Sequence, residues 1–246
     1  MHRTRLPVLA IIAALPSTAL GSSLAVMPAD EAAPAAPAAA TVSTSSWYLR
    51  NEIGGNLIPS ISLKDRTVLG IQVSDADLSM DAGVGWNIAF GIKANDLLAF
   101  EISSGLSYNT FKSVSGTLDD GVNAPLSGTL DADGHLLQVP ILMGPRFEIP
   151  VGESLRLNLG ASIGGMYLDG ELTQIDVLPI AGGGDSSWAF AYSATVGVDW
   201  AITPNIAVGA AYRFLGTASA SFGPESIIET DGIYNQQVLA SVTLRF

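Results

Sequence analysis

Apolar and polar residues alternate along most of the chain that follows residue 46. The clearest stretch, LSMDAGVGWNIAFGI at 78–92, places apolar side chains at even positions and small or polar ones at the odd positions. This period of two predicts β-strands with one apolar and one polar face. Similar stretches begin near Trp47, Leu97, His135, Ser154, Ser187, Ile206 and Tyr234. The pattern predicts an all-β protein of eight antiparallel strands, long enough for tilted membrane crossing, which takes roughly 9–11 residues per strand.

The connections between these predicted strands alternate in length. The short ones are KAND at 93–96, PVGE at 150–153 and TPN at 203–205. The long ones are roughly 58–77, 112–134, 169–186 and 216–232. Short turns at one end and long loops at the other are typical of an up-and-down transmembrane barrel with periplasmic turns and extracellular loops.

Charged residues indicate which face of the barrel lies inside, because within the strands they share the phase opposite the apolar residues. They are Arg50, Glu52, Asp81, Glu101, Arg146, Glu148, Arg156, Asp199, Arg213 and Arg245. A soluble barrel with an apolar interior is the alternative, but its exterior would be rich in Lys and Glu. A charge at the middle of a membrane costs roughly 2–4 kcal/mol, so the uncharged face suits lipid. We expect these equal numbers of bases and acids to form a neutral, structural charge network in the lumen.

The final strand, NQQVLASVTLRF, ends on an aromatic residue. Its outward apolar positions are Val238, Ala240, Val242, Leu244 and Phe246. We expect this strand to pair with the first one, because an open strand edge is not stable in lipid.

With WYLRNEIGGN at 47–56 and QVPILMGPRFEI at 138–149, this strand resembles those of small eight-stranded bacterial outer-membrane barrels. Within that group the likeness is to the opacity-like, porin-family proteins and to the membrane domain of OmpA-type proteins. The resemblance implies an outer-membrane location in a Gram-negative-type bacterium, contact with lipid and lipopolysaccharide, and a C-terminal signal for the barrel-assembly machinery.

The N-terminal residues follow a different pattern. Residues 1–25 have a basic start, an apolar core and small residues near Ala19 and Gly21, as signal peptides do. Residues 26–45 are rich in Ala and Pro and predict a periplasmic linker. The barrel is expected at 46–246.

Composition and charge narrow the possible partners. A net charge of −12 argues against nucleic acid, and the absence of cysteine excludes thiolate chemistry. Most acidic residues lie in the predicted loops, which makes an extracellular ligand of these loops a candidate partner. The echo of SGTLDDG at 115–121 and SGTLDADG at 127–134 suggests a hairpin. Its acids Asp119, Asp120, Asp131 and Asp133 are weak metal candidates, since the EF-hand pattern is incomplete and a solvated acidic tip explains them better than a metal site does.

Candidate catalytic groups are few. Gly160, Ser162 and Gly164 match G-x-S-x-G, but they fall inside a strand instead of at the strand-to-helix turn that this chemistry needs. His135 is the only histidine after the signal peptide. We therefore expect no enzyme and no cofactor.

The expected role is structural and surface-presenting, because side chains fill an eight-stranded barrel. A small porin-like channel remains an alternative, since many lumen residues are Gly or Ala. A lipid-modifying enzyme that uses His135 is a third.

Overall fold

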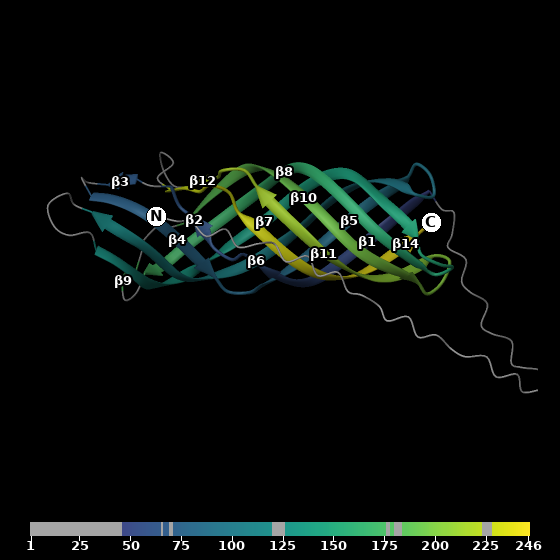
Figure 1. Ribbon diagram of the computed structural model, residues 1–246, viewed down its shortest axis with the longest axis horizontal. Coiled ribbons are helices and arrows are strands. Elements are labelled where there is room, and N and C mark those ends of the chain that lie inside the picture. Colours follow the sequence, from purple (N-terminus) through teal and green to yellow (C-terminus); the bar gives the residue numbers. More distant parts are fainter. Residues whose placement is uncertain are drawn as a thin grey trace, which may run out of the picture. The chain divides into compact units, whose positions relative to one another are not determined.

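A computed structural model describes residues 46–64, 66–68, 71–119, 126–175, 178–179, 184–222 and 228–246. The predicted signal peptide and linker, residues 1–45, lie outside the described residues. No helix in the described part of the chain is long and apolar enough to cross a membrane. The regular structure of this part consists of β-strands (Figure 1).

Eight antiparallel strands form a closed ring. They are β1 (Trp47–Leu57), β5 (Gly83–Lys93), β6 (Leu98–Asp119), β7 (Leu126–Pro150), β8 (Leu155–Ile175), β10 (Gly184–Ala201), β11 (Ile206–Thr217) and β14 (Tyr234–Arg245). Each strand pairs with the next one in this order, and β14 pairs with β1. The up-and-down barrel predicted from the alternation is thus confirmed.

The ring closes along the full length of the first and last strands. The β1–β14 register runs from Tyr48 opposite Arg245 to Leu57 opposite Gln236. At the end of this ladder, the backbone N–H of Phe246 donates to the carbonyl of Trp47 over 3.1 Å. The terminal residue therefore belongs to the seam that leaves the barrel without an open edge, as expected for a structure surrounded by lipid.

Three tight turns lie at one end of the barrel, which we call the turn end. They connect β5 to β6, β7 to β8 and β10 to β11, at the positions predicted for the short connections. In Figure 1 the C-terminus lies at this end, while β3 and β9 lie at the opposite, loop end. Short elements at the loop end are β2 (Ile61–Ser62), β3 (Arg66–Val68), β9 (Leu178–Pro179), β12 (Ser221–Phe222) and β13 (Ile228–Glu229).

The strands extend further at the loop end than the sequence indicated. Strand β4 (Ile71–Met80) pairs with the upper part of β6, so the prediction that 58–77 is all loop is wrong. Residues 81 and 82 interrupt the extended chain and separate β4 from β5. Strand β5 then pairs with the part of β6 that is nearer to the turn end. The echoed segments of 112–134 do form a hairpin, in which Gly116 lies opposite Gly128.

The outward face of the barrel is apolar and carries aromatic residues near both ends. Trp47 packs on Phe90 at the turn end, with ring centroids 5.2 Å apart. At the loop end, the Phe214 ring lies between Tyr192 and Tyr234. Aromatic rings are enriched at both interfaces of membrane-spanning barrels. The exposed rings at the two ends of this barrel thus match the two surfaces of a bilayer.

Candidate functional site

The buried side chains inside the barrel lie in three layers. The half near the turn end holds charged residues, and above them lies a layer of amides and hydroxyls. This polar layer contains Asn56, Ser107, Asn109, Gln138, Asn235 and Gln237, all buried. An apolar layer follows at the loop end, formed by Ile58, Ile61, Met80, Phe111, Ala132, Leu136, Leu142, Met166, Leu168, Ala189, Ala191, Leu215, Ala220 and Ile233.

The structure brings nine of the ten predicted charge-network residues into ion pairs, and Asp81 is the exception. Alternation along the strands points their side chains inward. Three short pairs are Arg50 Nη2 to Glu101 Oε2 at 2.8 Å, Arg146 Nη2 to Asp199 Oδ2 at 3.1 Å, and Arg213 to Glu52. Each of these pairs joins strands that have one other strand between them in the ring. The network therefore connects non-adjacent strands through the interior of the barrel.

Glu148 is the centre of a second group of contacts. Its Oε2 lies 3.1 Å from Lys93 Nζ, 3.2 Å from Arg156 Nη1 and 3.8 Å from Arg245 Nη2. Arg146 Nε lies 3.9 Å from the other carboxylate oxygen. One carboxylate with almost no solvent exposure is thus shared among four cations.

The observed network differs from the predicted one in membership. Asp81 is exposed in the break between β4 and β5, where its backbone bonds with Thr110 and Asn109 hold it outside the lumen. Lys93, assigned to a turn by the sequence, is the last residue of β5 and enters the network. Tyr48, which sequence reasoning missed, donates its hydroxyl to Glu101 over 2.7 Å. Both additions follow the inward phase of their strands, which is the signal that could have found them.

These differences change the charge balance of the lumen. In the described part of the chain, the network contains the cations Arg50, Lys93, Arg146, Arg156, Arg213 and Arg245, and the carboxylates Glu52, Glu101, Glu148 and Asp199. The expectation of a neutral interior is therefore wrong, because loss of Asp81 and gain of Lys93 leave two more cations than carboxylates.

The weaker candidates do not converge in the structure. Asp131 and Asp133 are exposed on β7, Asp119 ends β6, and Asp120 lies outside the described residues. Among the residues that the structure places, no group of three or more His, Cys, Asp or Glu side chains could hold a metal ion. His135 stacks on Tyr108, with ring centroids 5.4 Å apart, and its Nδ1 lies 4.0 Å from a carboxylate oxygen of Glu171.

Ser162 of the G-x-S-x-G match lies in the middle of β8, opposite Ser193 of β10. That extended position lacks the sharp turn that presents a nucleophilic serine. The C-terminal positions Val238, Val242, Leu244 and Phe246 are all exposed on the outward face. This geometry is what a lipid-facing signal strand requires, and its recognition by the assembly machinery stays a prediction.

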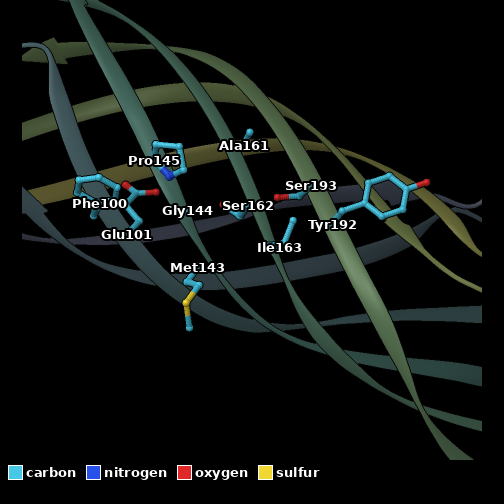
Figure 2. Close-up of a pocket in the computed structure, with 10 residues that line it drawn as sticks. All are labelled: Phe100, Glu101, Met143, Gly144, Pro145, Ala161, Ser162, Ile163, Tyr192 and Ser193. Carbon is cyan, nitrogen blue, oxygen red and sulfur yellow. The ribbon is translucent and has the colours of Figure 1, made fainter.

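A hollow of about 650 Å³ lies in the barrel wall beside the network (Figure 2). Outward residues such as Phe100 and Met143 line it together with Glu101 of the network. The β7–β8 ladder lacks pairs at Gly144 and Pro145, since proline has no N–H to donate. The hollow therefore lies where the β7–β8 ladder is interrupted and where small residues such as Gly144 and Ala161 line the wall.

Comparison with known proteins places the chain in a class. A family model described as "Outer membrane protein beta-barrel domain" matches residues 19–246, and the chain belongs to this family. It is accordingly an outer-membrane β-barrel protein of a Gram-negative-type bacterium. No curated protein matches the chain in sequence.

Solved structures with a similar arrangement include three bacterial barrels. Neisserial surface protein A is 16% identical with a TM-score of 0.49, and the match covers 81% of this chain and 97% of that one. OprG of Pseudomonas aeruginosa is 14% identical with a TM-score of 0.45, covering 84% and 99%. Ail of Yersinia pestis, in complex with the heparin analogue sucrose octasulfate, is 13% identical with a TM-score of 0.43, covering 82% and 99%.

Proposed function

We propose that this protein is a structural, surface-presenting component of the outer membrane, with a lumen that does not conduct. In this role the barrel is an anchor in lipid and lipopolysaccharide, and the strands and loops of the loop end form the surface that meets extracellular ligands. The observation that carries the proposal is a pair of side-chain contacts that cross the lumen between opposite strands.

Two contacts cross the full width of the bore. Strands β7 and β14 are diametrically opposite in the ring of eight, since three strands separate them on either side. Arg245 of β14 nevertheless reaches Glu148 of β7, and Asn235 Nδ2 of β14 donates to Gln138 Oε1 of β7 over 2.7 Å. The apolar layer lies beyond both contacts. A hydrated ion would therefore have to break a buried ion pair, a buried hydrogen bond and an apolar seal.

The loop end supplies the surface in this proposal. Strands β6 and β7 continue past the apolar layer as a paired hairpin up to Leu118 and Leu126. The exposed hydroxyls of Thr117 and Ser127 lie 2.9 Å apart on this hairpin. Regular pairing gives the hairpin a defined shape. A preformed surface suits recognition, because less conformational entropy is lost when a ligand binds.

Planar-bilayer recording of the purified barrel tests the sealed lumen. We expect no steady single-channel conductance from the wild type, with a general porin as the positive control for insertion and detection. Steady openings in the wild type would overturn the proposal in favour of the porin-like alternative.

A second measurement tests the role at the surface. A strain that lacks the gene should become sensitive to detergent and regain resistance on complementation. A variant in which 116–128 of the hairpin is replaced by a short turn should keep the barrel folded and lose ligand binding by whole cells. Unchanged detergent resistance and unchanged binding in these strains would contradict the structural and presenting roles respectively.

A further inference from the structure

The positive charge of the lumen is concentrated at one place. Arg50, Arg146 and Arg213 have the three carboxylates of Glu52, Glu101 and Asp199 as their short ion-pair partners, which leaves that part of the network neutral. In the described chain, Lys93, Arg156 and Arg245 have one carboxylate within ion-pair distance, and it is the same one, Glu148. The excess of two positive charges therefore surrounds Glu148.

Arg245 is the least satisfied member of this group. Its side chain is 1% exposed, and its nearest carboxylate oxygen lies 3.8 Å away. None of its three guanidinium nitrogens, Nε, Nη1 and Nη2, has a hydrogen-bond partner among the described residues. Buried guanidinium groups of this kind are rare, because each unsatisfied donor loses the hydrogen bond it would make with water.

A small anion would accept hydrogen bonds from Arg245 and would also reduce the excess positive charge by one. Water could accept hydrogen bonds from Arg245, but it would leave the excess charge uncompensated. A buried charge without a partner is strongly destabilising, and the low dielectric of the interior strengthens its attraction for an opposite charge. We propose that the Lys93–Arg156–Arg245 cluster binds a small monovalent inorganic anion, of the halide class, in the lumen at the turn end.

The cluster also indicates the route of entry. The side chains of Lys93 and Arg156 are 9% and 15% exposed, more than that of Arg245. Both lie at strand ends beside the turns, which face the periplasm in barrels of this topology. The anion therefore enters from the periplasmic side, and the apolar layer keeps it from passing through.

Bromide is a suitable probe because it scatters anomalously and resembles chloride. Crystals of the wild-type barrel grown in bromide should show an anomalous peak inside the lumen, within contact distance of the Arg245 guanidinium. No peak in the lumen, or peaks on the outer surface that mark an adventitious ion only, would overturn the proposal.

Thermal unfolding in detergent gives an independent test. At constant ionic strength, replacing isethionate, which is too large for the cluster, with bromide should raise the unfolding midpoint of the wild type by a few degrees, since a ligand of the folded state stabilises it. Arg245→Gln should lose this rise, and Lys112→Gln, at an exposed lysine of β6, should keep it. Equal midpoints in both salts for the wild type, or an undiminished rise in Arg245→Gln, would contradict the site. If Arg245→Gln does not fold, the bromide crystal decides.

Discussion

Arg245 and Glu148 contact each other across the full width of the barrel, with Nη2 and Oε2 separated by 3.8 Å. The two residues lie on strands that share no hydrogen bond and occupy opposite positions in the ring. Their contact makes the interior of this barrel a continuous, packed structure, and it relates the last strand of the chain to a strand about one hundred residues earlier. The stability of the barrel should therefore depend on interior charges in addition to the backbone ladder.

Glu148→Gln tests this dependence most directly. The substitution keeps the shape of the side chain but leaves Lys93, Arg146, Arg156 and Arg245 without their shared carboxylate. We expect the free energy of unfolding to fall by about 3–5 kcal/mol, as when one partner of a buried ion pair is removed. Urea unfolding followed by gel mobility measures it.

Glu171→Gln is the matched control for this variant. Its carboxylate is half exposed beside His135, so the loss should stay within about 0–1 kcal/mol. Equal unfolding midpoints for the two variants would contradict the internal role of Glu148.

Gly91 tests the close packing beneath Tyr48. The two residues lie opposite each other on β5 and β1, and a methyl group at position 91 would overlap the Tyr48 ring. We expect Gly91→Ala to destabilise the barrel by roughly 1–3 kcal/mol, because the ring must move and give up its hydrogen bond to Glu101.

A double-mutant cycle separates this clash from a general loss of strand flexibility. In a Tyr48→Ala background, Gly91→Ala should be nearly neutral. Gly128→Ala, at a hairpin position with open space around it, should be nearly neutral in the wild type. If Gly91→Ala is equally costly with and without Tyr48, steric overlap is not the cause.

Leu168 and Leu159 distinguish the inner apolar layer from the lipid-facing surface on one strand, β8. Leu168 is fully buried in the lumen, whereas Leu159 is 41% exposed. Leu168→Ala should cost about 2–5 kcal/mol, since it leaves a cavity in a packed layer. Leu159→Ala should cost clearly less, because detergent or lipid fills the space. A reversed order of unfolding midpoints would mean that the apolar layer is not packed.

Phe246→Ala separates assembly from stability. The variant keeps the backbone N–H that reaches Trp47 but lacks the exposed ring. We expect less heat-modifiable barrel in outer-membrane fractions, and a nearly unchanged unfolding midpoint for the barrel that does assemble. Phe246→Tyr should restore the amount, because it keeps an aromatic terminus. Wild-type amounts of the Ala variant would remove the terminal ring from the assembly signal.

Much of the fold could be predicted from the sequence because a strand has only two faces. Once one face is uncharged, the phase of each strand determines which residues point inward, and Arg50, Glu148 and Arg245 follow from that rule. The lengths of the connections then determine the order of strands. The alternation of residues and the lengths of the connections are therefore enough to predict the order and direction of the strands.

Strand register and strand interruptions depend on contacts with neighbouring strands. They could therefore not be predicted from the sequence pattern. The break after Met80 moved Asp81 out of the lumen, although Asp81 keeps the period of two. The apolar layer was missed because Met166 and Leu168 occupy the inward phase, where polar residues were expected. The pairing of cations with carboxylates depends on the tilt and stagger of strands around the ring. A short stretch of sequence carries no information on either quantity.

The non-neighbouring ion pairs limit how such a chain can enter a membrane. A single hairpin contains Arg50 without Glu101, or Arg146 without Asp199, because each pair needs a strand from further round the ring. Within one hairpin Arg50 keeps Glu52 and Arg146 keeps Glu148, but both arginines lack their shorter partners from further round the ring. Hairpins inserted one at a time would therefore carry poorly compensated charges into hydrocarbon, where a charge at mid-bilayer costs roughly 2.5–3.5 kcal/mol. Curling of the whole ribbon, with its ionic side turned inward before or during entry, avoids that barrier.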